Sequence, residues 1–434
     1  MKTHILILLS IFVLSPFFLF SQTQIGNDID GLAAGDNSGI VSFSDDGTIV
    51  AIGGPGNDDA GNNSGHVRIF ENSSGDWEQL GNTIFGDSPG DHFGGSVSLS
   101  SDGSILAIGS PYAEIAGYVR IFELNDSGIW TQIGDDLVGE ADSGEFDNFS
   151  FGISVSLSDD GTILAIAEAR GGDPWEPQYG HPGFIHMFEN SSGTWTQIGD
   201  FIETNIPYLR KISLAGNGET VAGSGLGWWS WWFLGAASVY KNIAGNWVQA
   251  GNNFLGDWSN TIRGVSLSLD GSRIAIGGST TKVYEYITND WEQIGEDIEY
   301  ENIYEFSGDL KLSNNGTVVA LSGMDNTSSQ TQFGFVRVYK SIAGAWIKAG
   351  IDIIGEGLGD YYHNVDLSSD AKKISIGSMT NNSNGIDSGH VRVFDLSAIL
   401  STDANTFVQF YLYPNPATNQ FTIQLDAASE LERI

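Results

Sequence analysis

The chain has 434 residues and a net charge of −36, because 54 acidic residues face only 18 lysines and arginines. This charge argues against nucleic acid or an anionic membrane as the main partner, since both bind Lys and Arg. The sequence has no cysteine, which excludes disulfides, thiolate metal sites and cysteine nucleophiles, and its 41% of hydrophobic residues is enough for a packed core.

Residues 1–21 are predicted to be a cleavable signal peptide. Lys2 supplies a positive charge, residues 5–20 form a nearly unbroken apolar run, and Ser21 is a small residue suited to a cleavage site. The alternative is a membrane anchor, but the run is shorter than the roughly 20 residues of a spanning helix, and Pro16 disfavours a continuous one. We therefore expect an exported mature chain without a transmembrane helix.

Residues 22–397 contain an internal repeat. Equivalent turns lie at Gly47, Gly103, Gly161, Gly218, Gly271, Gly316 and Ala371. The mean period is (371 − 47)/6 = 54 residues. In the second copy, residues 96–100 alternate large and small side chains, an Asp-Gly turn follows, and three further strands are expected at 105–109, 119–122 and from Trp130 onward. Each repeat therefore predicts four antiparallel strands.

The fourth strand of six repeats begins with a tryptophan, at Trp77, Trp130, Trp195, Trp247, Trp291 and Trp346. The fourth strand of the seventh repeat is predicted at the N-terminus, because residues 23–31 match residues 131–139 in register. Such an offset joins the two ends of a closed ring and leaves no free edge between blades. The sequence thus predicts an all-β, seven-bladed β-propeller of four-stranded blades, closed by an N-terminal strand that completes the last blade. We expect the tryptophans to pack between neighbouring blades.

Some repeats resemble a known family. Phe93-Gly94, residues 109–111 (Gly-Ser-Pro) and residues 117–122 resemble FG-GAP repeats, as in the propellers of integrin α-subunits. The resemblance implies a propeller, but copies four to seven lose most of these elements. The D-x-D-x-D-G calcium loop of that family has no counterpart here, so its calcium site is not implied.

The C-terminal region resembles a sorting signal. After a linker at 398–410, residues 411–419 (Tyr-Leu-Tyr-Pro-Asn-Pro-Ala-Thr-Asn) and the alternating strand 420–425 resemble the start of the C-terminal sorting domain of type IX secretion substrates. This resemblance implies that residues 411–434 contact secretion machinery, and that the protein is secreted or lies on the outer surface of a Gram-negative bacterium. The pattern stops at Ile434, which predicts a fragment or a defective signal. An ordinary turn before a strand is the alternative.

Residues that could carry chemistry were compared between repeats, and no catalytic residue is predicted. His66 and His390 occupy the same repeat position, which indicates a structural role, and no carboxylate or histidine stands out as a lone departure from the repeat. Residues 86–90 match G-x-S-x-G, but no helix follows, so a blade-linking loop is expected.

No cofactor motif is found, and metal binding is left open. Residues 57–63, and the group Asp142, Glu145 and Asp147, offer the oxygen ligands that calcium prefers. Their spacing matches no recognised calcium loop, and solvated polar loops are the alternative.

An aromatic segment within residues 225–235 replaces a polar loop of the fourth repeat. It contains Trp228, Trp229, Trp231 and Trp232, which predict a platform for sugar faces or apolar ligands. The alternative is a hydrophobic plug against a neighbouring blade.

These observations favour an exported binding or interaction protein, monomeric, with a glycan or protein ligand and no nucleic acid. A polysaccharide hydrolase or lyase on a propeller scaffold is the alternative, and a purely structural surface protein is a third.

Overall fold

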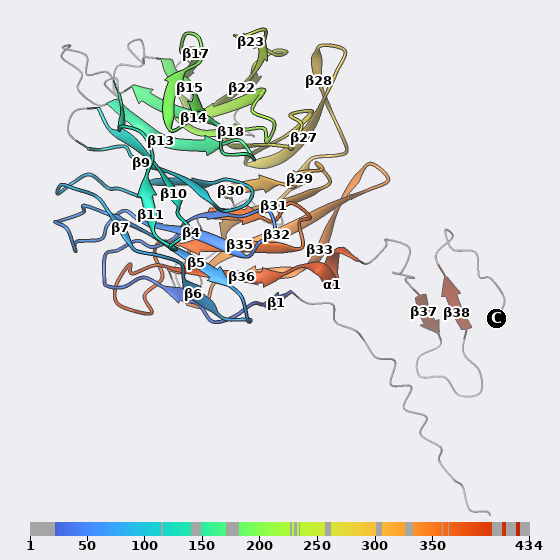
Figure 1. Ribbon diagram of the computed structural model, residues 1–434. Coiled ribbons are helices and arrows are strands. Elements are labelled where there is room, and N and C mark those ends of the chain that lie inside the picture. The colour runs from blue at the N-terminus through green and yellow to red at the C-terminus, as the bar shows by residue number, and fades with distance from the viewer. Residues whose placement is uncertain are drawn as a thin grey trace, which may run out of the picture.

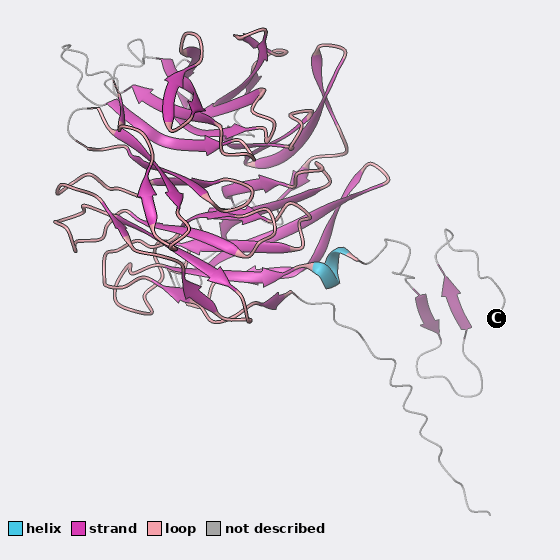
Figure 2. Ribbon diagram, viewed as in Figure 1, coloured by secondary structure: helices cyan, strands magenta, loops and turns pink. Residues whose placement is uncertain are grey.

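The computed structural model describes residues 22–113, 116–139, 149–170, 182–225, 228–229, 232–233, 235–256, 262–300, 306–325, 333–357, 359–362, 364–401, 410–413 and 422–425. Seven antiparallel sheets form a seven-bladed β-propeller, and the described residues contain one short helix, α1 (Ser397–Leu400) (Figure 2). The innermost strand of each blade contacts that of the next, and the innermost strand of blade 7 contacts that of blade 1. The predicted fold class is confirmed.

Each blade has four strands, named A to D from the axis outward. The A strands are β3 (Ile40–Phe43), β8 (Ser96–Leu99), β13 (Phe149–Leu157), β18 (Leu209–Leu214), β25 (Ile262–Leu267), β30 (Phe306–Leu312) and β34 (Asn364–Leu367). The B strands are β4 (Ile49–Gly54), β9 (Ile105–Ser110), β14 (Ile163–Arg170), β19 (Thr220–Gly225), β26 (Arg273–Gly278), β31 (Val318–Asp325) and β35 (Lys373–Ser378). The C strands are β5 (His66–Asn72), β10 (Tyr118–Leu124), β15 (Pro182–Ser191), β22 (Ala236–Ile243), β27 (Thr280–Ile287), β32 (Phe333–Ile342) and β36 (His390–Asp395).

The outermost D strand is split into two segments in six of the blades. The first segments are β6 (Trp77–Gln79), β11 (Trp130–Gln132), β16 (Thr194–Gln197), β23 (Asn246–Gln249), β28 (Asp290–Gln293) and β1 (Thr23–Gln24). The second segments are β7 (Ile84–Phe85), β12 (Leu137–Val138), β17 (Ile202–Pro207), β24 (Phe254–Leu255), β29 (Ile298–Glu299) and β2 (Ile29–Asp30). In blade 6 a single strand, β33 (Ala345–Ile354), takes this place.

The N-terminal strand closes the ring as predicted. Both β1 and β2 pair with β36 of blade 7 (Figure 1). Ile29 is buried in one cluster with Phe43 of blade 1 and Val391 and Val393 of blade 7. The first and last described parts of the propeller therefore share one blade and one core.

The D-strand tryptophans pack between blades. Trp130, Trp195 and Trp291 are buried, and Trp130 belongs to a cluster with residues of blade 1. The indole of Trp130 donates a hydrogen bond to the backbone oxygen of Leu80, in the D strand of the preceding blade, at 3.0 Å. The indoles of Trp77, Trp291 and Trp346 make the equivalent bonds to Ile25, Ala250 and Ile294. The predicted role of these side chains is confirmed.

The remaining elements lie after the last blade. Helix α1 packs on the propeller through Ile399, which is buried in a cluster with residues of blades 6 and 7. Strands β37 (Phe410–Tyr413) and β38 (Thr422–Leu425) pair with each other. Among the described residues, no helical segment has the length and hydropathy of a membrane span.

Candidate functional site

The four strands of each blade alternate in direction, so the B–C and D–A connections all lie at one end of the propeller. This end is called the loop face. The tryptophan-rich segment belongs to this face as the B–C connection of blade 4. Its backbone forms a small hairpin in which β20 (Trp228–Trp229) pairs with β21 (Trp232–Phe233). Trp231 and the side chains of this hairpin lie outside the described residues, so the aromatic platform stays a prediction.

The first acid-rich loop, residues 57–63, uses its polar side chains to hold a turn. Asp58 accepts a hydrogen bond from the backbone of Asn63 at 2.7 Å. In the corresponding loop of blade 7, the neutral Asn382 accepts the same bond from Asp387 at 2.8 Å. An amide therefore replaces the carboxylate without loss of the turn, so Asp58 has a structural role there, and calcium binding by this loop stays a prediction. Asp142, Glu145 and Asp147 lie outside the described residues.

A polar cluster recurs on the loop face of blades 1, 2 and 7. Its first member is the first residue of strand C. The second lies between the two segments of strand D and accepts a hydrogen bond from the D-strand glutamine. The third is an aspartate in the preceding D–A loop, and it accepts a hydrogen bond from a backbone N–H of that loop. In blade 7 these are His390, Asp28 and Asp360, in blade 2 Tyr118, Asp136 and Asp91, and in blade 1 His66, Thr83 and Asp36.

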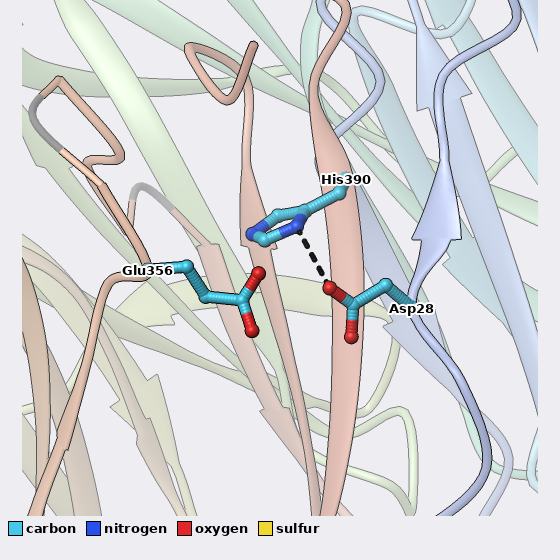
Figure 3. Close-up of side chains that lie close together, drawn as sticks. All are labelled: Asp28, Glu356 and His390. Atoms are coloured by element: carbon cyan, nitrogen blue, oxygen red, sulfur yellow. Dashed lines mark ion pairs between the residues drawn. The ribbon is translucent and has the colours of Figure 1, made fainter. Parts of the chain in front are cut away.

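The blade 7 version, together with Glu356, is here called the seam cluster, because it joins the N-terminal strand to blade 7. His390 is fully buried, and its imidazole lies between two carboxylates: Nδ1 is 3.5 Å from Asp28 Oδ2, and Nε2 is 3.3 Å from Asp360 Oδ1. Neither contact has hydrogen-bond geometry, and both ring nitrogens are buried without a hydrogen-bond partner. In Figure 3 the carboxylates of the exposed Glu356 and of Asp28 both lie below the imidazole, one to the left and the other to the right.

The neighbours of each histidine set its charge. Burial alone would lower the pKa of His390, but the carboxylates of Asp28 and Asp360 outweigh it and raise that pKa to about 9. In blade 1, Thr83 stands where Asp28 lies in blade 7. Burial and the positive charge of Arg68 therefore lower the pKa of His66 to about 4. One repeat position thus holds a cationic histidine in blade 7 and a neutral one in blade 1 near pH 7.

The axis of the propeller is lined by serines at the same position of five of the seven A strands. Each hydroxyl accepts a hydrogen bond from a backbone N–H of the next blade, at 2.9–3.0 Å. The serines are Ser42, Ser98, Ser156, Ser213 and Ser266. They fix the blades to one another around the axis.

Blades 6 and 7 depart from this ring, which corrects the expectation that no carboxylate stands out from the repeat. Lys311 takes the serine position in blade 6 and Asp366 in blade 7, and they form an ion pair at 2.8 Å. The other oxygen of Asp366 accepts a hydrogen bond from the backbone of Phe43 at 3.0 Å. A second ion pair lies two residues earlier in the A strands, where Lys211 of blade 4 is 3.1 Å from Asp309 of blade 6. Aligning the seven A strands by this position would have found the pair.

Two hollows among the described residues differ in size and place. The axial cavity has about 100 Å³ and includes Ser98, Ser156, Lys311 and Asp366 in its lining. A larger hollow of about 300 Å³ lies on the loop face at blade 2, between Ala113, Tyr118, Arg120 and Val138.

The loop-face hollow combines apolar walls with fixed charges. The guanidinium of Arg120 is held by Asp87 at 2.5 Å and by Asp136 at 2.8 Å. The hydroxyl of Tyr118 donates to Asp91 at 3.2 Å, and burial raises the pKa of Tyr118 to about 12. These groups are pre-oriented, a property of binding pockets of this volume.

Comparisons with known proteins support the fold. No protein-family model matches the chain, and it has no significant match among curated proteins. The FG-GAP and sorting-domain resemblances therefore remain predictions.

Similar solved structures include hydrazine synthase of Kuenenia stuttgartiensis, at 12% identity and a TM-score of 0.53 over 87% of this chain and 98% of that chain. They also include a putative 6-phosphogluconolactonase from Bacteroides uniformis ATCC 8492, at 11% identity and a TM-score of 0.52 over 74% of this chain and 86% of that one. A putative 6-phosphogluconolactonase from Bacteroides fragilis NCTC 9343 aligns at 14% identity and a TM-score of 0.51, over 78% and 89% of the two chains. At these identities the likeness shows a shared propeller fold.

Proposed function

We propose that the protein is an exported binding protein whose propeller holds a ligand site on its loop face. The observation that carries this proposal is the hollow of about 300 Å³ at blade 2, formed by loops and lined by both apolar and charged side chains. A pocket of this size is at the lower end of those that bind small molecules or single residues of a polymer.

The axis supports the same conclusion. Its cavity of about 100 Å³ is below the roughly 300–1,000 Å³ of small-molecule pockets, and its serines, Lys311 and Asp366 are already bonded to neighbouring blades. A ligand there would have to break bonds that hold the ring together. Binding at the loops leaves these bonds intact.

Export rests on the two ends of the sequence. The apolar run at residues 5–20 supports passage through the inner membrane, and the resemblance at 411–425 supports a type IX-like route to the cell surface or medium. Aromatic rings at Trp228, Trp229, Trp231 and Trp232, in another loop of the same face, support a glycan or protein ligand.

The test measures binding of the mature protein to a panel of soluble polysaccharides. Val138, exposed at the rim of the hollow, is changed to Trp, so that a bulky ring blocks the entrance without burying a polar group. Leu255→Trp is the matched control, because Leu255 is the equivalent exposed residue of blade 4. We expect Val138→Trp to weaken binding at least 10-fold and Leu255→Trp to leave it unchanged.

A second variant replaces all four tryptophans of the aromatic segment by alanine. If neither this variant nor Val138→Trp changes binding to any panel member, while both fold normally by circular dichroism, the loop-face site is wrong. Release of a reducing sugar by the wild-type protein would instead favour the hydrolase alternative.

A further inference from the structure

We propose that the seam cluster is a binding site for a first-row divalent cation such as Zn²⁺ or Mn²⁺, with Asp28, Glu356 and His390 as ligands. One ligand atom from each of these three side chains lies within 4.8 Å of the others. Imidazole nitrogen and carboxylate oxygen are the donors these cations take in proteins. The inference is independent of the proposed function.

The spacing of the donors fits a metal better than a hydrogen bond. His390 Nδ1 and Asp28 Oδ2 are 3.5 Å apart, and this nitrogen has no hydrogen-bond partner although it is fully buried. Two ligands of a tetrahedral zinc ion, each at about 2.0–2.1 Å from the metal, lie about 3.3 Å from one another. A buried imidazole facing a carboxylate at this separation is therefore arranged to share a cation with it (Figure 3).

Each of the three ligands has the outer partner that metal ligands usually have. Asp360 is not one of the three side chains whose ligand atoms converge, so its carboxylate, 3.3 Å from the second ring nitrogen of His390, takes the outer position and would hold the imidazole in place. Gln24 donates a hydrogen bond to Asp28 Oδ1 at 2.6 Å, leaving Oδ2 to face the ring. Arg392 lies 3.4 Å from Glu356 Oε1.

The charges of the cluster also suit a dication. Asp28, Glu356 and Asp360 contribute three negative charges, and Arg392 contributes one positive charge. A metal-bound imidazole is neutral, so the cation would displace the proton that His390 carries near pH 7. The sum is then −3 + 1 = −2, which a divalent cation neutralises. Glu356, with 48% of its side chain exposed, gives the ion a path from solvent.

The equivalent positions of the other blades provide controls. In blade 2 the imidazole is replaced by Tyr118, and in blade 1 the D-strand carboxylate is replaced by Thr83. Within the part of the chain that the structure describes, Asp28, Glu356 and His390 are the group of histidine and acidic residues whose ligand atoms are close enough to share a metal ion.

The experiment titrates the full mature protein, treated with a chelator and dialysed, with ZnCl₂ and separately with MnCl₂ by calorimetry. The key variant is Glu356→Gln, a half-exposed loop residue whose substitution keeps the fold and removes the ligand charge. We expect one saturable site in the wild-type protein whose affinity falls at least 10-fold in Glu356→Gln. Asp360→Asn should weaken binding 10–100-fold, as removal of outer partners does elsewhere.

Asp87→Asn, at the position of blade 2 that corresponds to Glu356, should leave the affinity unchanged. A second readout is the midpoint of thermal unfolding, which the cation should raise in the wild-type protein and not in Glu356→Gln, because a bound ion stabilises the folded state. Absence of saturable binding of both cations, or equal affinity in the wild type and Glu356→Gln, would overturn the proposal. Sites elsewhere on the surface would persist in Glu356→Gln and so cannot mimic the result.

Discussion

His66 shows how one substitution in a neighbouring strand changes the behaviour of a buried side chain. It is fully buried and both ring nitrogens lack a hydrogen-bond partner. No carboxylate occupies the D-strand position beside it, where blade 1 has Thr83. Burial and Arg68 therefore lower the pKa of His66 to about 4, against 6.5 in an unfolded chain.

This shift predicts a loss of stability in mild acid. The unfolded state takes up a proton on His66 near pH 6.5, whereas the folded state does so near pH 4. The stabilisation is therefore complete above pH 6.5 and is lost as the pH falls toward 4, by an amount on the order of 3 kcal/mol. Urea unfolding of the wild type and of His66→Tyr, which copies Tyr118 of blade 2, should give curves that diverge over this pH range, with the variant less sensitive. Parallel curves would contradict the assignment.

At the scale of the strand, a short motif explains how blades attach to one another. The D strand usually reads Trp, any residue, Gln, an apolar residue and Gly. Each of the four recurring residues contributes an interaction. For four of the six tryptophans, the apolar residue of the preceding blade accepts the indole hydrogen bond, as Leu80 does from Trp130. The glycine has a positive φ, and a Cβ on Gly81 would lie 2.8 Å from Trp130. The glutamine ties the strand to the residues after the glycine, as Gln79 does with Thr83.

Much of this could be predicted from the repeat, and some of it could not. The number of blades, the strand order and the closing strand follow from a periodic pattern, because alternation and turns are local properties. The partner of an indole lies in another blade, about 50 residues away for Trp130, which no local pattern specifies. The seam cluster was missed for the same reason: Asp28 and His390 are neighbours only after the ring closes.

The closing strand can be tested by removing residues 22–31 from the mature chain. Ile29 and Ile25 would leave the core shared by blades 7 and 1, and the backbone bonds of Ile25 to Val393 and of Gly31 to Gly389 would be lost. Full burial of one isoleucine contributes about 1.5–3 kcal/mol, and the partly buried Ile25 adds less than that, so the urea midpoint should fall markedly. A synthetic peptide of residues 22–31 should restore it by pairing with β36.

Removing residues 402–434 instead is the control, because β37 and β38 pair with each other. This truncation should leave the urea midpoint unchanged. An equally stable chain without residues 22–31 would show that the ring does not need its closing strand.

At the scale of the whole molecule, the ring is held at its axis as well as at its rim. Backbone hydrogen bonds between A–B turns run from blade 7 through blade 1 to blade 6, beginning with Ser369 to Asp45 and Asp45 to Ser101. The serine ring adds a second layer, and the Lys311–Asp366 ion pair replaces it where blades 6 and 7 meet. The ammonium of Lys311 cannot accept a hydrogen bond from the backbone N–H of blade 7, so its ion pair with Asp366 links blades 6 and 7 instead.

This ion pair predicts an asymmetry between single and double substitution. Burial alone would lower the pKa of Lys311, but Asp366, Asp309 and Asp45 outweigh it and raise that pKa, so the ammonium is charged near pH 7. Lys311→Ser would leave Asp366 without its counterion and should cost about 1–3 kcal/mol of unfolding free energy, between the values for surface pairs and for buried pairs, because 37% of the Lys311 side chain is exposed. Lys311→Ser combined with Asp366→Ser restores the residue type of the other five blades.

The double variant should recover most of that loss, since a serine at each position accepts the backbone N–H of the following blade as Ser266 does from Leu312. Removing a buried pair together is usually neutral or stabilising, whereas removing one partner is not. Chemical unfolding of the two single variants and the double variant forms a cycle that measures the coupling. Additive losses would mean that Lys311 and Asp366 act separately. If the double variant is nearly as stable as the wild type, the axis needs either a serine in all seven blades or the complete Lys311–Asp366 ion pair between blades 6 and 7.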